Sequence, residues 1–261
     1  MVIILELICS CKESENRALY SRGFTLVELL TVIAIVAILA GLIFGSVGQS
    51  VQMGKRIGCI SNLKQIITAA HLYAGDNNGR YSDARVIASR DFNYLLAYAG
   101  GAPKTFVCPA TQNRLSNILD DKGRLKDLKQ MASSRSGSGS SYLLAGFMGW
   151  KTPYFTDFSG PDGDERVYSV LKTESSVSSY VHYHSEFNLK GLIPGAAGIF
   201  LITDNTFSGT RNWPDSDDNH GTKGANAVFL DGHAAWIPRS GYVFTYELSQ
   251  DDGRSSIEPV P

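Results

Sequence analysis

A run of apolar residues from Leu26 to Val47 constrains this chain more than any other feature of its sequence. The run has no proline, and its single charged residue is Glu28. A helix of this length reaches roughly 33 Å, which is enough to cross the hydrocarbon core of a membrane. Apolar residues occupy every face of such a helix, as expected for a helix surrounded by lipid or by other helices. The sequence therefore predicts a transmembrane segment at about residues 26–47.

Glu28 indicates a function for this segment. A carboxylate one turn inside a membrane helix is costly unless it has a partner. Cleavage of the chain after Gly23 would give Phe24 a new α-amino group, one helical turn before Glu28. The helix macrodipole also favours a carboxylate near a helix N-terminus. In a packed array of subunits, Glu28 could neutralise the amine of a neighbouring chain.

The sequence R-G-F-T-L-V-E-L-L at residues 22–30 resembles the class III signal of type IV prepilins and type II secretion pseudopilins. The resemblance implies cleavage after Gly23 by a prepilin peptidase and N-methylation of Phe24. It also implies that Glu28 acts in assembly with other pilin or pseudopilin subunits, on an inner-membrane assembly platform. The alternative is an ordinary signal anchor that carries a stray glutamate.

Residues 1–23 are predicted to be a leader peptide. They are long and mixed for this family, whose leaders are usually short and basic, so the true start codon is open. Arg17 and Arg22 put positive charge on the cytoplasmic side. This predicts a single pass through the bacterial inner membrane, N-in and C-out, with a periplasmic globular domain.

Charge and cysteine content narrow the expectations further. The formal net charge is −1, so the chain has no general attraction for nucleic acid, and none is expected as a partner. Of the four cysteines, Cys9 and Cys11 lie in the leader. Cys59 and Cys108 would remain, in a compartment that permits disulfides. A disulfide between them and two buried thiols are both open.

The apolar helix is predicted to continue past the membrane, as a spine over residues 24–74. Its second half carries an amphipathic stripe, formed by Ile60, Leu63, Ile67 and Ala70. The sequence Asp-Asn-Asn-Gly at residues 76–79 then stops the helix. Three further stretches also resemble a large pseudopilin-like family: residues 59–66, 73–81 and 106–109. The first two of these are close to the major pseudopilin of type II secretion.

Residues 75–261 are predicted to form one α+β domain. The clearest element is a hairpin, with strands at 225–230 and 233–237 around Asp231-Gly232. Further strands are expected at 142–148, 166–171, 178–187, 198–203 and 242–248. A short helix is expected within 112–131, and a flexible loop at 133–141. The predicted fold class is a long N-terminal hydrophobic helix, the pilin spine, packed by its C-terminal half on an antiparallel β-sheet globular domain.

The densest set of metal-ligating residues surrounds the hairpin. It consists of Asp215, Asp217, Asn219, His220 and Asp231. Oxygen-rich loops suit calcium. The element also resembles one in prepilin-like proteins where Asp-Gly follows a histidine after nine residues, although ten intervene here. Because major pseudopilins hold a structural calcium in a C-terminal loop, the resemblance implies calcium as a cofactor; the alternative is a solvated acidic loop.

Two histidines give a second hypothesis. His182 and His184 alternate on a predicted strand, so both would face one side. With Asp204 or His233 they could bind zinc or copper; otherwise they are solvent-facing strand residues. The chain has no G-x-S-x-G, H-E-x-x-H, P-loop or Rossmann pattern. We therefore expect no enzyme activity.

The leading hypothesis is a pseudopilin-like structural subunit of a periplasmic filament in a type II protein secretion system. One alternative is a type IV pilus subunit for adhesion, motility or DNA uptake. Another is a membrane-anchored metal-binding domain that does not polymerise.

Overall fold

The computed structural model describes residues 24–82, 91–149, 170–205, 214–251 and 253, without the side chains of 43–46. The chain divides into two compact units, residues 1–48 and 49–261. Gly23 lies outside the described residues, as does most of the strand predicted at 166–171.

The first unit contains the beginning of α1, a helix from Leu26 to Asp76. The large apolar side chains of its first turns, such as Leu26 and Leu30, are exposed in the single chain. No single helix in the described ranges is long and apolar enough to span a membrane. One bent pair of helical segments is long and apolar enough when the two are taken together, by length and composition only: Leu26–Leu42 and Val47–Asp76. Exposed apolar surface of this extent is typical of segments that contact lipid or other proteins.

The second unit begins with the rest of α1, which is amphipathic. Leu63, Ile67 and Ala70 of the predicted stripe are buried, and Ile60 is half-buried. The helix ends where the sequence predicts. Asn78 and Gly79 adopt positive φ angles, and the Gly79 N–H donates a 2.8 Å hydrogen bond to Ala74 O. This left-handed turn closes the helix in the way that glycine permits.

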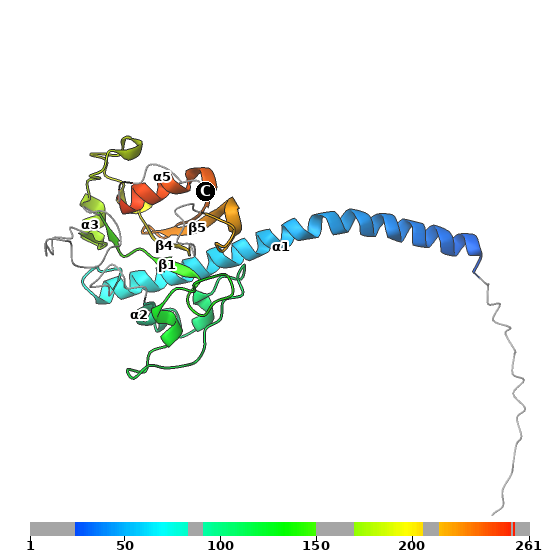
Figure 1. Ribbon diagram of the computed structural model, residues 1–261, viewed down its shortest axis with the longest axis horizontal. Helices are drawn as coiled ribbons and strands as arrows, with labels where there is room; N and C mark the ends of the chain where they lie inside the picture. The colour runs from blue at the N-terminus through cyan, green and yellow to red at the C-terminus, as the bar shows by residue number, and fades with distance from the viewer. Residues whose placement is uncertain (1–23, 83–90, 150–169, 206–213, 252, 254–261) are drawn as a thin grey trace, which may run out of the picture. The chain divides into compact units, whose positions relative to one another are not determined.

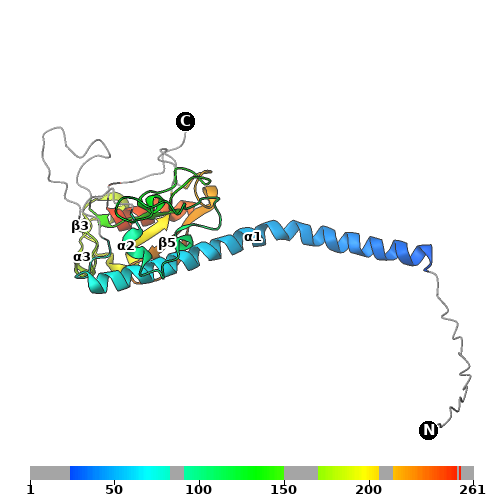
Figure 2. The ribbon, with the colours of Figure 1, turned by 90° about the horizontal axis from the view of Figure 1, so that it is seen from below.

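A four-stranded antiparallel sheet packs against this part of α1 (Figures 1 and 2). Its order is β1 (Tyr142–Leu144), β4 (Phe200–Asp204), β5 (Gly224–Phe229) and β6 (Ala234–Pro238). A second sheet pairs β2 (Phe147–Met148) with β3 (Val170–Leu171). The remaining helices are short except α5. They are α2 (Asn93–Leu96), α3 (Glu174–Ser179), α4 (Gly195–Gly198) and α5 (Arg239–Gln250), with 3₁₀ turns η1 (Pro103–Phe106), η2 (Lys126–Lys129), η3 (Glu186–Asn188) and η4 (Gly221–Lys223).

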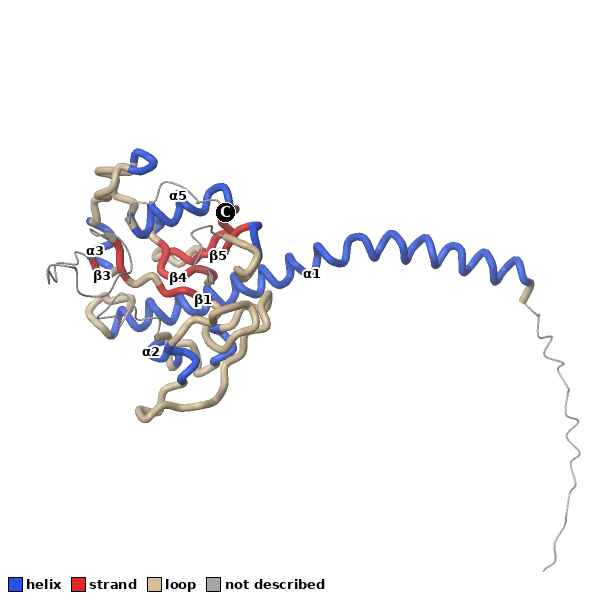
Figure 3. Tube along the Cα trace, in the orientation of Figure 1, coloured by secondary structure: helices blue, strands red, loops and turns tan. Residues whose placement is uncertain are grey.

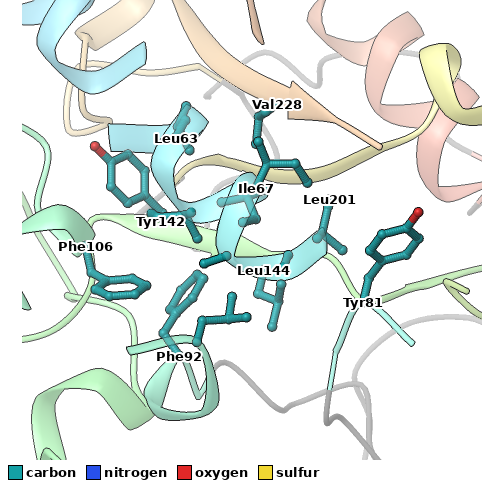
Figure 4. Packing of buried hydrophobic residues seen from close by; sticks show 14 of the residues in the cluster. Leu63, Ile67, Tyr81, Phe92, Phe106, Tyr142, Leu144, Leu201 and Val228 are labelled. Atoms are coloured by element: carbon teal, nitrogen blue, oxygen red, sulfur yellow. The ribbon is translucent and has the colours of Figure 1, made fainter. Parts of the chain in front are cut away.

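The two central strands are buried along their whole length because the sheet has a cluster of apolar side chains on each face. The larger cluster joins α1 to the sheet. Figure 4 shows Leu63 and Ile67 of α1 among aromatic and aliphatic side chains, including Phe92, Tyr142 and Val228. The smaller cluster contains Phe200, Phe229 and Tyr242 of α5. Each fully buried aliphatic side chain stabilises the fold by about 1.5–3 kcal/mol. The predicted α+β fold is therefore confirmed.

The predicted hairpin is also confirmed. The register of β5 on β6 pairs Ala227 with Ala235 and Asn226 with Trp236. At the turn, the Gly232 N–H donates to Phe229 O at 2.9 Å, and Gly232 has φ +88°. The strands predicted at 142–148 and 198–203 correspond to β1, β2 and β4.

Two predicted strands are wrong. Residues 242–248 belong to α5, where Tyr242 and Tyr246, four residues apart, pack beside Phe200 of the sheet. Residues 178–187 include the end of α3, irregular backbone and the start of η3. Thr173 starts α3 with a capping box, accepting a 3.0 Å hydrogen bond from Ser176 N. Packing on the sheet overrides the strand propensity of residues 242–248. The capping box accounts for α3, which takes up the start of the second range.

The helix predicted within 112–131 is wrong as well. Figure 3 shows mostly loop between α2 and β1, and within 112–131 the one helical element described is the short turn η2. Asp120 stabilises a turn here instead of a helix, because its side chain accepts hydrogen bonds from Lys122 N and Arg124 N. The loop predicted at 133–141 is paired with its neighbours: Gln112 N donates to Arg135 O at 2.6 Å, and Ala132 N donates to Ser140 O at 2.9 Å.

Candidate functional site

The N-terminal motif folds into a helix cap. Thr25 N and Thr25 Oγ1 each donate a 2.9 Å hydrogen bond to Glu28 Oε2. Glu28 N donates to Thr25 Oγ1 at 3.2 Å. This reciprocal arrangement is a capping box, with Thr25 as the cap and Glu28 as the third helical residue. Glu28 therefore has a role in the single chain that does not require a second subunit.

The cap also fixes where the carboxylate lies. Glu28 turns back to the backbone N–H of Thr25, which is the residue next to Phe24. Phe24 itself is exposed. A chain cut after Gly23 would start at Phe24 and carry its N-terminal ammonium group there. This group would lie one residue before Thr25, whose N–H binds the Glu28 carboxylate. The arrangement is suited to neutralising an N-terminal amine, of the same chain or of a neighbour.

Cys59 of α1 and Cys108, which follows η1, form a disulfide with a Cα–Cα distance of 5.1 Å. Both residues are fully buried. Of the two alternatives that the sequence left open, the structure has the disulfide. It attaches α1 covalently to the segment that packs beside it.

A buried polar cluster lies against this disulfide. Asp204 ends β4 and accepts hydrogen bonds from Asn226 N at 2.6 Å, Asn226 Nδ2 at 2.9 Å and Asn219 Nδ2 at 3.0 Å. His220 Nε2 lies 3.4 Å from Asp204 Oδ2 and 3.6 Å from Cys108 Sγ. Burial raises the pKa of Asp204, against the opposing effects of His220 and the amide donors. The cluster is a network of side chains from four separate segments.

The protonation state of His220 follows from its neighbours. Asn226 Nδ2 lies 2.9 Å from His220 Nε2, and the same amide nitrogen donates to Asp204. An amide nitrogen can only donate, so Nε2 accepts and carries no proton. Burial lowers the pKa of His220, in agreement with a neutral ring. Because Nε2 faces both Cys108 and Asp204, these residues do not form a catalytic relay, which would need the two ring nitrogens to face different partners.

The five predicted calcium ligands are not gathered into one set. Asp215 and Asp217 form a local turn, in which Asp217 N donates to Asp215 Oδ1 at 2.9 Å. Asn219 and His220 point instead to Asp204. Asp231 lies at the hairpin turn, where it accepts from His233 N at 3.0 Å and lies 2.6 Å from His233 Nδ1. The sequence placed these residues near one another along the chain, but their hydrogen bonds turn them toward different partners.

His182 and His184 do not lie on a strand, and their acidic partner is Asp251 rather than Asp204. His184 N and His184 Nδ1 lie 2.9 and 2.8 Å from Asp251 Oδ1, and His182 Nδ1 lies 3.1 Å from it. Tyr180 donates its hydroxyl proton to Asp251 Oδ2, and Tyr183 N donates to the same oxygen at 2.6 Å. Burial alone would raise the pKa of Asp251, but these donors lower it.

Sequence reasoning missed the residues that organise both clusters. Asp251 follows α5 with φ +52°, and its partners are 67 to 71 residues earlier in the chain. Asn226 sits inside a strand that reads as apolar. No local pattern marks either residue, because their importance comes from contacts between distant segments. Within the described residues, the side chains close enough to share a metal ion form two groups: Cys59, Cys108, Asp204 and His220; and His182, Glu247 and Asp251.

Comparison with known protein families gave one match. Residues 19–44 match the family model for the prokaryotic N-terminal methylation motif. The comparisons with curated proteins and with solved structures gave no match. The matched range contains Gly23, Phe24 and Glu28 and ends inside α1.

Proposed function

We propose that this chain, whose N-terminal methylation motif is of the type IV prepilin kind, is a structural subunit of a pilin-like filament. In this proposal a prepilin peptidase cuts after Gly23, Phe24 is methylated, and the exposed part of α1 becomes the buried core of a helical assembly. The globular unit then coats the outside. The function is mechanical and requires no catalytic residue.

Glu28 is the observation that carries the proposal. It is the only charged residue between Leu26 and Val47, and it lies within the matched motif. A carboxylate in such a segment requires a partner. The capping box holds it at the start of α1, close to the position of the amine that cleavage would create. Before assembly the segment anchors the subunit in the membrane, and in the filament Glu28 pairs with a subunit's N-terminal amine.

The finer assignment is to a type II protein secretion system, with a periplasmic filament that grows from an inner-membrane assembly platform. It is supported by the resemblance of residues 59–66 and 73–81 to the major pseudopilin of such systems. Both stretches lie around the last turns of α1 and the turn that closes it. Long surface fibres containing this chain would instead assign it to a type IV pilus.

Intact mass and N-terminal sequencing of the chain from its native envelope test the proposal directly. We expect a chain that starts at N-methylated Phe24. A chain that retains residues 1–23, or that is processed at another position, contradicts the proposal. Deletion of the prepilin peptidase is the control, and should return the unprocessed mass.

A further inference from the structure

The disulfide and the polar cluster beside it contain four metal-ligating side chains. The sulfurs of Cys59 and Cys108, a carboxylate oxygen of Asp204 and a ring nitrogen of His220 all lie within 4.8 Å of one another. While the disulfide is intact, neither sulfur is a thiolate. Reduction would convert both into thiols that can ligate a metal.

We propose that the reduced chain binds one zinc ion through Cys59, Cys108, Asp204 and His220. Two thiolates, one imidazole and one carboxylate make a four-ligand set of the types that zinc prefers. Soft thiolate ligands also favour zinc over the hard cations calcium and magnesium. The proposal is independent of the filament function.

His220 is already in the state that a zinc ligand needs. Its Nε2 atom carries no proton, because it accepts a hydrogen bond from Asn226 Nδ2. The same atom lies 3.6 Å from Cys108 Sγ and 3.4 Å from Asp204 Oδ2. The lone pair that would bind the metal therefore faces two of the other three ligands. Zinc would displace the Asn226 hydrogen bond without a change of tautomer.

The backbone holds the ligands on four different segments. Cys59 comes from α1, Cys108 follows η1, Asp204 ends β4 and His220 precedes β5. The Cα atoms of the two cysteines are 5.1 Å apart, so rotation of their side chains can separate the sulfurs while the backbone stays in place. Asp204 is kept at its position by hydrogen bonds from Asn219 and Asn226.

The surroundings also suit the charge of the site. Zinc with two thiolates and one carboxylate carries a net charge of about −1. Arg135 and Arg56 act electrostatically on His220, and Arg135 Nη2 donates to Ala110 O, two residues after Cys108. Arg56 stacks over Trp236, which in turn contacts the His220 ring edge to face. Two cations near the site offset its charge.

The conversion of the disulfide form into the zinc form balances in electrons and protons. A dithiol reductant supplies two electrons and two protons, the Cys59–Cys108 bond breaks, and the reductant becomes a disulfide. Zinc then replaces the two thiol protons, which pass to solvent. A disulfide oxidant reverses the sequence: it takes two electrons from the thiolates, the sulfur–sulfur bond forms again and zinc leaves. Zinc and the disulfide are thus alternative links between α1 and the rest of its unit.

The test uses the full chain in detergent with Cys9→Ser and Cys11→Ser, so that Cys59 and Cys108 are its only cysteines. The protein is folded with zinc in the presence of a dithiol reductant or of an oxidant, desalted, and analysed for bound metal. We expect about one zinc per reduced chain and none in the oxidised chain. Cobalt in place of zinc should give thiolate-to-metal charge-transfer absorption in the reduced chain alone.

Matched histidine variants identify the ligand. His220→Gln should weaken zinc binding by about tenfold or more, and His184→Gln, a change in the other cluster, should not affect it. Asp204→Asn, which retains an oxygen for the amide donors, gives a second variant if His220→Gln folds poorly. Melting of each oxidised variant checks folding. A reduced chain without zinc, equal binding by His220→Gln and its parent, or equal zinc in the oxidised chain overturns the proposal.

Discussion

At the scale of single residues, Glu28 has two separable roles. Its carboxylate accepts hydrogen bonds from Thr25 N and Thr25 Oγ1 at the helix cap, and its charge can neutralise an N-terminal amine. Glutamine at the third helical position also forms a capping box. The hydrogen bonds and the charge can therefore be removed one at a time.

We expect Glu28→Gln to be inserted and cleaved but not to assemble, because it retains the cap and loses the charge. Thr25→Ala is the matched control: it loses the cap and retains the carboxylate, and should assemble. Crosslinked oligomers from envelopes measure assembly. Wild-type levels of oligomer from Glu28→Gln would show that the charge is not required.

Lys172 is a second residue with an unusual environment. Its side-chain nitrogen Nζ is fully buried and donates to Phe200 O at 2.7 Å and to Ser249 Oγ at 3.3 Å. Burial lowers the pKa of Lys172 well below its usual value. The unfolded chain therefore binds this proton more readily than the folded chain, and the contribution of Lys172 to stability increases as pH rises toward about 10.4.

We expect Lys172→Met to leave the free energy of unfolding at pH 7 unchanged or higher, because an apolar side chain of similar length replaces a buried amine that loses its contact with water on folding. Phe200 O keeps a donor in Ser249 Oγ, at 3.2 Å. Urea unfolding at pH 7 and pH 9 measures the effect, with exposed Lys223→Met as the control. A clear loss of stability in Lys172→Met would mean that its hydrogen bonds outweigh the cost of burial.

At the scale of elements, the end of α5 acts as an anchor. Asp251 holds the segment that contains Tyr180, Tyr183 and His184 through hydrogen bonds to both carboxylate oxygens. The Gly253 N–H donates to Glu247 Oε1 at 3.0 Å, which links Gly253 to α5. The anchor consists of titratable groups, so its strength depends on pH.

The contribution of this anchor to stability should be highest between about pH 4 and pH 6.5. Hydrogen bonds from Tyr180 and the backbone lower the pKa of Asp251 despite its burial, so its contribution is lost as pH falls through the folded value. Burial lowers the pKa of His184, but Asp251 reverses this and raises it, so its contribution is lost as pH rises through the folded value.

We expect His184→Gln to flatten the decline of stability above about pH 6.5 and Asp251→Asn to flatten both declines. Chemical unfolding across this pH range gives the two slopes. Exposed His233, in its separate contact with Asp231, provides the control variant His233→Gln. An unchanged alkaline slope in His184→Gln would exclude this ion pair as its cause.

Helix ends and turns could be predicted from the sequence where neighbouring residues alone determine the backbone conformation. The Asp-Gly turn requires a hairpin, and Asp-Asn-Asn-Gly ends α1, because these residues set their own backbone angles. Residues 242–248 have apolar positions at both strand and helix spacing, and only the contact of Tyr242 and Tyr246 with the sheet selects α5. Asp204 and His220 were visible as ligand types, but their meeting with Cys108 depends on tertiary structure and could not be predicted.

At the scale of the whole molecule, the Cys59–Cys108 disulfide closes a loop with a sequence separation of 49. Chain-entropy arguments give such a link about 4 kcal/mol of stabilisation, mainly by restricting the unfolded chain. We expect Cys59→Ala/Cys108→Ala to lower the free energy of unfolding by about 2–5 kcal/mol. The double variant Cys9→Ser/Cys11→Ser, measured alongside it with a chelator present, should not change it. A loss well below 2 kcal/mol would mean that packing alone holds α1 on the sheet.

The position of this disulfide has a consequence for the chain under tension, as it would be in the proposed filament. A force applied at the start of α1 travels along the helix to Cys59, where a covalent bond offers a second path into the domain at Cys108. Residues 60–107, which include the end of α1 and all of α2, then lie outside the stretched path. The helix end and its turn are shielded from the load while the bond is intact. Pulled from its two ends, the oxidised chain can extend only by the residues outside that loop, and the reduced chain by its full length.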